Sequence, residues 1–593
     1  MTYKAPVQDL LFAMKAAGNM DELIENGVFG EVDEDLISAV LEEAGKFASD
    51  VLVPLNTIGD LAGSHLKDGK VEVPAGWTEA YQGWAEAEWG ALPASPDYGG
   101  QGLPTSVSMG VGEIWNSANM AFGLAPMLTQ GAVDAIYEHA SDELKAKYLP
   151  NMISGKWTGT MNLTEPQAGS DLSAVRTKAD PVGDGSFRIK GTKIFITYGD
   201  HEMTENIIHL VLARLPDAPH GTKGISLFLV PKYLVNEDGS IGERNDVQCA
   251  GVEHKLGIHA SPTCVMSFGD NEGAIGYLVG EENRGLINMF VMMNAARLAV
   301  GVQGVAIAEA ATQKAIEYAN DRKQGRLMDT PAGEMAEIIG HPDIRRTLMT
   351  MKALTAASRC ICAATSAATD VSERAESEEV RAQANARVAL LTPIAKAFST
   401  DVGVEVASMG VQVHGGMGFV EETGAAQFYR DARILPIYEG TNGIQAMDLV
   451  LRKLPMAGGE VMKGYLAEIH GTINEVRQSN IAELGDTADR LEEAVKALEK
   501  ASMWIFENMA SNTDGVLAGA TPYLKLFGLT SGGHYLARGA LIASRSGDAA
   551  LAPQIKLTRF FATHHLTETT GLAAVTMGGD DLLADASSEM FAA

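Results

Sequence analysis

The first 150 residues place apolar side chains at helical spacing. One predicted helix over residues 35–51 has an apolar face made of Ile37, Val40, Leu41, Ala44, Phe47, Ala48 and Val51. A turn-rich loop, rich in glycine, follows at 94–102, and the helical pattern then resumes to about Pro150. We therefore expect an N-terminal helical domain over residues 1–156.

From Trp157 the pattern changes to short β-type runs that alternate with turn residues. Such runs occupy residues 187–190, 193–197, 207–212 and 225–230. Several short strands at this spacing are typical of a small antiparallel barrel, so we expect a middle antiparallel β-barrel domain over 157–284.

After Gly285 the helical period returns and continues to about Arg452. Residues 454–459 read as a linker, and a further amphipathic region follows it. We expect a C-terminal helical domain over 285–453 and an additional helical domain over 454–593, whose acidic end from Gly578 is loosely ordered. The fold class is then α+β with several domains, in agreement with about four domains for 593 residues.

Composition narrows the function. The chain has 46 basic and 76 acidic side chains, so its net charge is −30, which disfavours nucleic acid and anionic membrane surfaces as partners. No signal layout opens the chain, and no run of 18 apolar residues occurs, so we expect no membrane span. The four cysteines lack CxxC spacing, which favours reduced thiols in the cytoplasm. His564 and His565 lack a third ligand at helical spacing, so no metal site is assigned.

Two segments of the predicted β domain carry candidate chemistry. Residues 161–171 offer the hydroxyls of Thr164 and Ser170, and Gly169 permits a close backbone approach, so this loop suits either a pyrophosphate or an ordinary tight turn. In residues 191–199, Phe195 and Thr197 lie two apart on a strand and face one side. They suit a planar ring, although an ordinary strand pair has the same pattern.

Residues 413–419 and 437–445 contain the third candidate group. Their glycine cluster permits close backbone contact, but no G-x-G-x-x-G occurs in the chain, which argues against a Rossmann nicotinamide site. Glu439 stands among aromatic and small residues. Burial there would raise its pKa and make it a usable base, whereas a glutamate beside a glycine also commonly starts a helix.

Taken together and in order, these segments resemble the acyl-CoA dehydrogenase flavoprotein family over about residues 35–450. The resemblance also rests on residues 98–100, 254–263 and 322–326. It implies an N-terminal helical domain, a middle β domain and a C-terminal four-helix bundle, with FAD bound across a subunit interface and therefore at least a homodimer. The region after residue 455 resembles the extension of a bacterial branch, which favours a dimer over a tetramer.

The resemblance implies roles for individual residues. Glu439 matches the base that removes the α-proton of an acyl-CoA while the β-hydrogen leaves as hydride, and Arg297 and Gly440 match substrate-side positions. Some relatives carry the base immediately before Arg297, where this chain has Ala296. The matched FAD-binding positions are Leu163, Thr164, Gly169, Ser170, Phe195, Thr197, Arg322, Gln412, Gly415, Gly416 and Thr441.

Two departures accompany the match. Many relatives carry tryptophan where this chain has Phe195, which lacks the indole N–H donor. The arginine segment 322–326 is one residue short and lacks the usual phenylalanine, so the adenine end of FAD is expected to be held differently.

The implied activity is α,β-desaturation of an acyl-CoA with electrons passed to electron-transfer flavoprotein. The branch implies 3-(methylthio)propanoyl-CoA as substrate, hence a role in dimethylsulfoniopropionate catabolism. Medium- or long-chain acyl-CoA and fatty acid β-oxidation, an acyl-CoA oxidase, and a non-catalytic acyl-CoA-binding scaffold stay open as alternatives.

Overall fold

The computed structural model describes residues 3–578, 583, 586 and 590–591, and it divides into two compact units. Unit 1 comprises Met1–Glu43, Thr105–Ser117 and Val300–Ala593, and unit 2 comprises Ala44–Pro104 and Ala118–Ala299. The predicted loosely ordered end from Gly578 lies almost entirely outside the described residues. Each unit is described below by itself.

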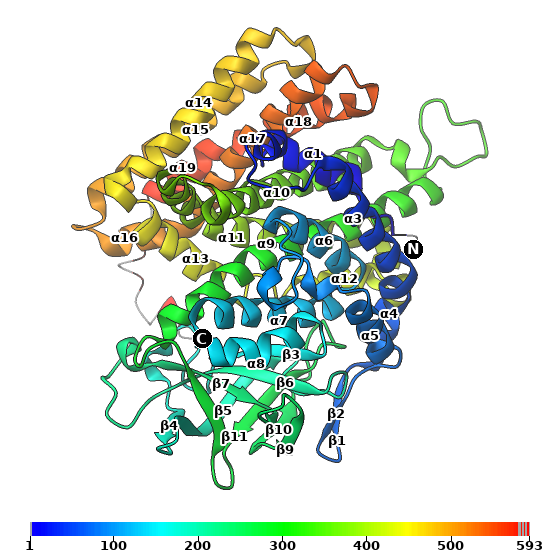
Figure 1. Ribbon diagram of the computed structural model, residues 1–593. Coiled ribbons are helices and arrows are strands. Elements are labelled where there is room, and N and C mark those ends of the chain that lie inside the picture. Colours follow the sequence, from blue (N-terminus) through cyan, green and yellow to red (C-terminus); the bar gives the residue numbers. More distant parts are fainter. Residues whose placement is uncertain (1–2, 579–582, 584–585, 587–589, 592–593) are drawn as a thin grey trace. The chain divides into compact units, whose positions relative to one another are not determined.

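Unit 2 is built on one curled sheet (Figure 1). Its strands are β3 (Trp157–Asn162), β4 (Lys178–Pro181), β5 (Ser186–Thr197), β6 (Asn206–Ala213), β7 (Ser226–Pro231), β10 (Val247–Val252), β11 (Thr263–Phe268) and β12 (Ala274–Val279). The strand order is β10-β11-β5-β12-β7-β6-β3, with β4 paired to β5. Two small hairpins accompany it: β1 (His65–Lys67) with β2 (Lys70–Glu72), and β8 (Tyr233–Val235) with β9 (Ile241–Arg244).

The predicted β domain is confirmed, with one departure in its pairing. All described strand pairs in the sheet are antiparallel except β3 and β6, which run parallel with Trp157 opposite Asn206. All eight residues of β6 are buried, which explains its continuous apolar sequence, because a strand covered on both faces needs no polar alternation. The two runs predicted at 187–197 join in β5, which continues through Gly191.

Helices cover one face of this sheet. Unit 2 contains α4 (Val53–Ala62), α5 (Trp77–Glu86), α7 (Met120–His139) and α8 (Asp142–Ile153), together with the start of α9 (Gly285–Asp321). Small residues let α7 approach its neighbours closely. A Cβ on Gly131 would lie 2.9 Å from Met292, and one on Gly159 of β3 would lie 2.5 Å from Ala132. The helices and sheet therefore share a tightly packed apolar core.

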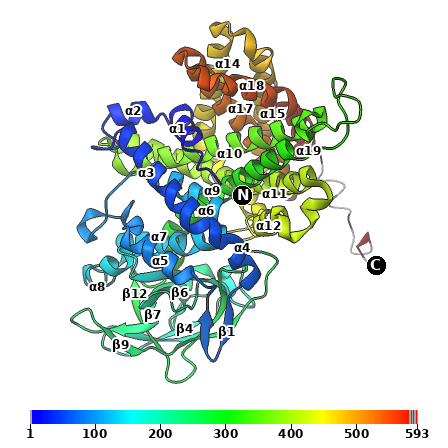
Figure 2. The same cartoon turned by 90° about the vertical axis from the view of Figure 1, so that its right-hand side faces the viewer.

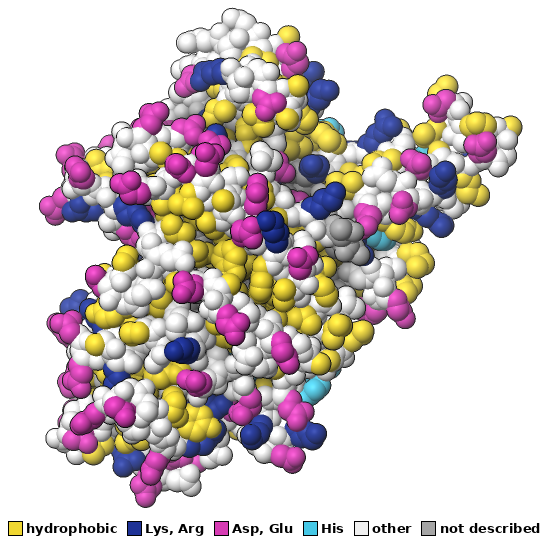
Figure 3. Space-filling model, turned by 45° about the vertical axis from the view of Figure 1, so that its right-hand side comes forward, with side chains coloured by type: hydrophobic (Ala, Val, Ile, Leu, Met, Phe, Trp, Pro, Cys, Tyr) yellow, Lys and Arg dark blue, Asp and Glu magenta, His cyan; other side chains and the backbone are white. Residues whose placement is uncertain are grey.

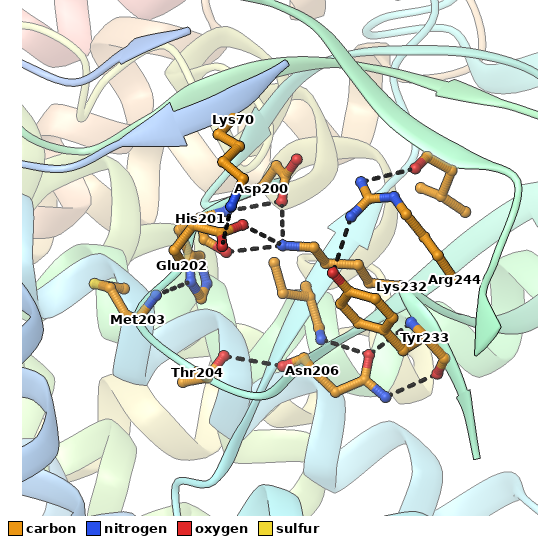
Figure 4. Close-up of polar contacts among 12 residues, drawn as sticks. Lys70, Asp200, His201, Glu202, Met203, Thr204, Asn206, Lys232, Tyr233 and Arg244 are labelled. Carbon is orange, nitrogen blue, oxygen red and sulfur yellow. Dashed lines mark hydrogen bonds and ion pairs between the residues drawn. The ribbon is translucent and has the colours of Figure 1, made fainter. Parts of the chain in front are cut away.

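A buried lysine ties the end of β7 to the loop after β5 (Figure 4). The ammonium of Lys232 lies 2.7 Å from a carboxylate oxygen of Asp200 and 3.3 Å from one of Glu202. Lys70 of β2 lies 3.4 Å from Glu202, which brings the β1–β2 hairpin into the same network. Two acidic partners balance the Lys232 charge, as a buried cation requires.

Unit 1 is helical. Besides the rest of α9 it contains α1 (Val7–Ala16), α2 (Met20–Glu25), α6 (Thr105–Ala118), α10 (Pro342–Arg374), α11 (Glu378–His414), α12 (Ala425–Ala432), α13 (Asn442–Asp448), α14 (Glu460–Ser479), α15 (Thr487–Asn508), α16 (Thr513–Ala518), α17 (Ala520–Ser546), α18 (Ala552–His564) and α19 (Thr569–Met577). The predicted helix at 35–51 is α3 (Glu34–Phe47) followed by a π-helical turn at Ala48–Leu52. Glu43 is the last residue of unit 1 before this turn.

The extension beyond residue 454 packs onto α10 and α11 within the same unit (Figures 1 and 2). A Cβ on Gly528 of α17 would lie 2.4 Å from Phe398 of α11, and one on Gly532 would lie 2.8 Å from Ala357 of α10. The segment predicted as a linker turns through positive φ at Ala457 and Gly458. The extension is therefore built into the helical core rather than tethered beside it.

Buried ion pairs fasten α6 to the long helices of unit 1. Arg359 of α10 donates to Glu113 of α6 at 2.6 Å and to Glu309 of α9 at 2.8 Å. Asp370 of α10 accepts from the backbone N–H of Ser106 and from its hydroxyl at the start of α6. These contacts satisfy charges that would otherwise be costly in a core.

One described helix, α9, is long and apolar enough to cross a membrane by length and composition. Its most apolar 18-residue window has a mean hydropathy of 1.5, and 67% of that window is buried inside the protein. The core helix of a soluble protein passes the same test, so this is weak evidence. The absence of a membrane span stays a prediction.

Candidate functional site

Unit 2 places the first predicted FAD segment in a tight turn after β3. The backbone N–H of Glu165 donates to the carbonyl of Ala168, and the N–H of Ala168 donates back, both at 2.9 Å. The Glu165 carboxylate accepts from the N–H of Arg176 and from the N–H and hydroxyl of Thr177. The turn is thereby closed at its base and secured to the chain that follows it.

Lys193 joins this turn to the second predicted segment. Its ammonium donates to the Leu163 carbonyl at 3.0 Å and to the Glu165 carboxylate at 2.8 Å, with both side chains almost fully buried. The N–H of Ile194 donates to the Thr164 carbonyl at 2.9 Å. The structure thus brings the two segments together through the backbone of the residues predicted to contact FAD.

The charges of this pair persist over the neutral range. Burial opposes ionisation of Glu165, but Lys193 and the hydrogen bonds from Thr177 and Arg176 outweigh it and lower the pKa of the carboxyl to about 2. Burial lowers the pKa of Lys193 to about 8, because Glu165 opposes that effect only in part. At neutral pH the contact is therefore an ion pair inside the protein.

Phe195 is aimed outward by an irregularity in β5. Lys193 pairs with Met266 and Ile196 with Cys264, so two residues of β5 lie opposite Val265 alone. Phe195 adopts a left-handed conformation, with φ 61°, and its side chain is 59% exposed. Such a conformation is unfavourable for a bulky residue, and it is frequently found at functional sites.

The residues of unit 2 fit a bound FAD. A Cβ on Gly169 would meet nothing within 4 Å, and Ser170 beside it is exposed, so the turn borders open space. Thr197 is half-buried next to the exposed Phe195 ring on the strand that the turn contacts. An open glycine with a neighbouring hydroxyl suits phosphate oxygens, and an exposed aromatic ring suits a planar ring system.

The predicted base lies in unit 1 between α12 and α13. Glu439 is half-buried and has a left-handed backbone with φ 55°, followed by Gly440 with φ 82°. The amide of Gln445 donates to the Glu439 carbonyl at 3.3 Å. Thr441 is the N-cap of α13, and its hydroxyl accepts from the N–H of Ile444 at 3.2 Å. The side chains of Gln445 and Thr441 thus hold the backbone of this loop, in which the base residue has a strained conformation.

Tyr438, which directly precedes Glu439, binds the same loop to α9. Its hydroxyl donates to the side-chain carbonyl of Gln303 on α9, and the Gln303 amide donates to Asn116 at 3.1 Å. Burial, with the negative charge of Glu439 nearby, raises the pKa of Tyr438 well above its ordinary value. The tyrosine is therefore a neutral donor.

The other residues of unit 1 predicted to reach FAD are exposed. Gln412, Gly415 and Gly416 stand at the end of α11, where the N–H of Gly415 donates to the Gln412 carbonyl. Arg322 begins an arm, residues 322–341 between α9 and α10, in which backbone bonds join Arg322 to Ile338. Exposure is what contact with FAD on a neighbouring subunit requires.

Arg297 belongs to unit 2, near the start of α9, and it is half-buried. Its guanidinium donates to the Asn294 side chain at 3.3 Å. The predicted site residues are thus divided between the units. Leu163, Thr164, Gly169, Ser170, Phe195, Thr197 and Arg297 lie in unit 2, and the rest lie in unit 1.

Sequence reasoning missed the residues that hold these segments. Glu165 and Lys193 lie inside the two motifs, but charged side chains next to exposed loops gave no sign of burial. Lys396 of α11, which contacts the loop of Glu439, was also missed. The sequence did contain an indication of its burial. Lys396 lies within the mainly apolar stretch 390–398, and a lysine in such a stretch is seldom buried unless it is paired.

Comparisons with known proteins bear on the same residues. Profiles described as acyl-CoA dehydrogenase N-terminal, middle and C-terminal domains match residues 38–156, 160–271 and 283–454. A profile described as acetyl-CoA dehydrogenase C-terminal like matches residues 465–587.

Two curated relatives match most of the chain. A 3-methylmercaptopropionyl-CoA dehydrogenase of Ruegeria pomeroyi is 47% identical over 98% of this chain and 99% of its own length. A butyryl-CoA dehydrogenase of Syntrophomonas wolfei is 37% identical over 79% of this chain and 78% of its own length.

Two solved structures share the fold. Caenorhabditis elegans ACDH-11 in complex with C11-CoA is 20% identical with a TM-score of 0.78, covering 95% of this chain and 91% of that one. A Bacillus anthracis acyl-CoA dehydrogenase complexed with FAD is 22% identical with a TM-score of 0.75, covering 94% and 90%. At 95% and 94% of this chain, both matches include most of the extension beyond residue 454.

Proposed function

Because this chain belongs to the acyl-CoA dehydrogenase family of FAD-dependent oxidoreductases, we propose that Glu439 is its catalytic base and that a short acyl-CoA is its substrate. The preferred substrate is 3-(methylthio)propanoyl-CoA, which would be oxidised to its 2-enoyl-CoA. The observation that carries this choice is the 47% identity to a 3-methylmercaptopropionyl-CoA dehydrogenase along nearly the whole of both chains. Butanoyl-CoA is the second candidate, because a butyryl-CoA dehydrogenase is 37% identical.

In this proposal each residue has a defined task. The Glu439 carboxylate takes the α-proton, and its own backbone N–H supports the negative charge that develops on the thioester oxygen. Bound FAD supplies the acceptor for the β-hydrogen. The turn at Leu163 and Thr164, with Gly169 and Ser170, would hold it by backbone and hydroxyl contacts.

The remaining contacts follow from what each side chain offers. Phe195 would lie against the flavin ring, and the Thr197 hydroxyl would donate a hydrogen bond to it. Arg297 would bind the anionic CoA arm, which needs a local cation on a chain of net charge −30. Gly440 would contact the substrate beside Glu439.

Replacing Glu439 tests the central assignment. Glu439→Gln keeps the shape of the side chain but removes the base, so we expect yellow, FAD-bound protein with at least a thousandfold lower turnover, on the order of general-base contributions. Glu507→Gln, at an exposed position on α15, serves as the control glutamate. Near-normal turnover by Glu439→Gln would show that the base is elsewhere.

We further propose a homodimer in which Arg322, Gln412, Gly415 and Gly416 reach the FAD of the partner. Exposed apolar side chains accompany these residues, namely Met328 and Met335 on the arm and Met417, Phe419 and Val420 after α11. Figure 3 shows hydrophobic side chains exposed on the arm. Phe419→Asp should convert the dimer to a monomer in light scattering and should lower FAD content. A wild-type monomer would contradict the proposal.

The electron acceptor and the location complete the proposal. We expect electrons to pass to electron-transfer flavoprotein rather than to oxygen, so hydrogen peroxide formation in air should be slow. A fast stoichiometric release of peroxide would favour the oxidase alternative. A cytoplasmic location accords with four buried cysteine thiols that carry no disulfide. We also propose that the chain divides into four domains, with boundaries at 156, 284 and 453.

A further inference from the structure

Lys396 is a buried cation on the inner side of the Glu439 loop. It lies on α11 and is 0% exposed. Its ammonium donates to the Gly440 carbonyl at 2.9 Å and to the side-chain carbonyl of Asn442 at 2.8 Å. A fully buried ammonium is expensive, so a fold retains one only where it makes several strong contacts.

Asn442, which accepts from Lys396, also contacts the next turn of α11. Its amide nitrogen, which carries two hydrogens, lies 3.1 Å from the Ala397 carbonyl, 3.0 Å from the Thr400 hydroxyl and 2.7 Å from the Asp401 carboxylate. The first residue of α13 is thereby bound to a rigid helix. The two residues between the base and this anchor, Gly440 and Thr441, leave little freedom for the loop.

The contacts bear directly on the strained base. Glu439 and Gly440 both have positive φ, and Glu439 lacks the freedom that glycine has in that region. The Glu439 carbonyl accepts a hydrogen bond from the side-chain amide of Gln445, and the Gly440 carbonyl accepts one from Lys396. Both peptide planes that follow the base are therefore fixed by side chains from helices.

We propose that Lys396, acting with Asn442, is a positioning residue that holds Glu439 in its left-handed conformation for proton abstraction. The ammonium does not act on the substrate. It fixes the Gly440 carbonyl, and so fixes the direction of the Glu439 side chain and of its N–H. This inference rests on the proposed role of Glu439 as the base.

The test compares Lys396→Met with Lys396→Arg and Glu439→Gln in the FAD-loaded protein. Methionine keeps the volume but cannot bind the carbonyl, so we expect kcat to fall at least tenfold, KM to change less than threefold, and FAD content to stay normal. Arginine retains a donor, and we expect it to restore at least a third of kcat. The acid limb of the kcat pH profile should move in Lys396→Met, because the base is no longer held in one environment.

Ser502→Ala is the matched control for lost stability. Ser502 lies on α15 in the extension and shares a buried hydrogen bond with the Tyr523 hydroxyl at 2.7 Å. The Ser502→Ala substitution should lower the melting temperature and leave kcat and the pH profile unchanged. If Lys396→Met does not yield folded protein, Asn442→Ala decides the question by the same readouts, with the same expected loss.

The outcomes separate the two claims. Normal turnover by Glu439→Gln would overturn the proposed base and, with it, the role of Lys396. Loss of turnover in Glu439→Gln, combined with a kcat within twofold of wild type and an unmoved pH profile in Lys396→Met or Asn442→Ala, would overturn the positioning role alone.

Discussion

Breaking the Lys193–Glu165 pair should destabilise unit 2 and weaken FAD binding at the turn that follows β3, residues 163–170. Lys193→Met removes the ammonium that binds both the Leu163 carbonyl and the Glu165 carboxylate, and it leaves that carboxylate buried without a cation. Removing one partner of a buried ion pair costs about 3–5 kcal/mol. For a unit of this size the melting temperature falls by roughly 2–4 °C per kcal/mol, so we expect a decrease on the order of 10 °C.

The pH dependence gives an independent measure of the same contact. The folded pKa of Glu165, about 2, lies below its ordinary value of 4.5, which is equivalent to roughly 3 kcal/mol in favour of the carboxylate. That stability is present above pH 4.5 and is lost as the pH falls towards 2. In Lys193→Met burial raises the pKa of Glu165 instead, so the deficit relative to wild type should shrink as the pH falls.

The assay is FAD binding to apoprotein, followed by flavin fluorescence, alongside thermal unfolding. Lys232→Met is the matched control, because it breaks a second buried lysine–carboxylate pair of the same unit, that with Asp200. We expect both variants to lose stability but only Lys193→Met to bind FAD at least tenfold more weakly. Equal FAD affinity in the two variants would refute the view that the Lys193 contacts shape the cofactor turn.

Three further results are expected. Gly169→Val should leave the apoprotein as stable as wild type but prevent FAD binding, since its side chain would fill space that is open in the fold; normal FAD content would contradict this. Arg359→Met leaves Glu113 buried without its cation, so unfolding of unit 1 should become easier by about 3–5 kcal/mol in denaturant titration. Burial, opposed by a hydrogen bond from Gln130, raises the pKa of Asp134 to about 6, so stability should fall as the pH rises from 4 to 6, by at most about 3 kcal/mol. Asp134→Asn should abolish that slope.

The element layout could be predicted from the sequence because it depends on local periodicity. The change from helical to β pattern at Trp157 and back at Gly285 agrees with β3 and α9. The parallel pairing of β3 with β6 could not be predicted, since either direction buries the same apolar side chains. The way α17 packs against α10 and α11 depends on Gly528 and Gly532, whose role appears only when the neighbouring helix is known.

The site could be predicted in its motifs but not in its conformation. Alternation places Phe195 and Thr197 on one side of a strand, but it also places Lys193 there, whereas Lys193 is buried and Phe195 is 59% exposed. The extra residue of β5 opposite Val265 causes this difference. The left-handed backbone of Glu439 could not be predicted from the sequence either, because glycine is the residue expected at positive φ. Tertiary contacts from Lys396 and Gln445 accompany that conformation.

The most direct test of the proposed dehydrogenase activity is an anaerobic titration of the purified yellow protein with acyl-CoA thioesters, monitored by flavin absorbance. The panel is 3-(methylthio)propanoyl-, butanoyl-, octanoyl- and palmitoyl-CoA. We expect stoichiometric bleaching by 3-(methylthio)propanoyl-CoA, weaker bleaching by butanoyl-CoA, and no bleaching in Glu439→Gln. A protein that binds FAD but is bleached by none of these thioesters would contradict the proposed activity.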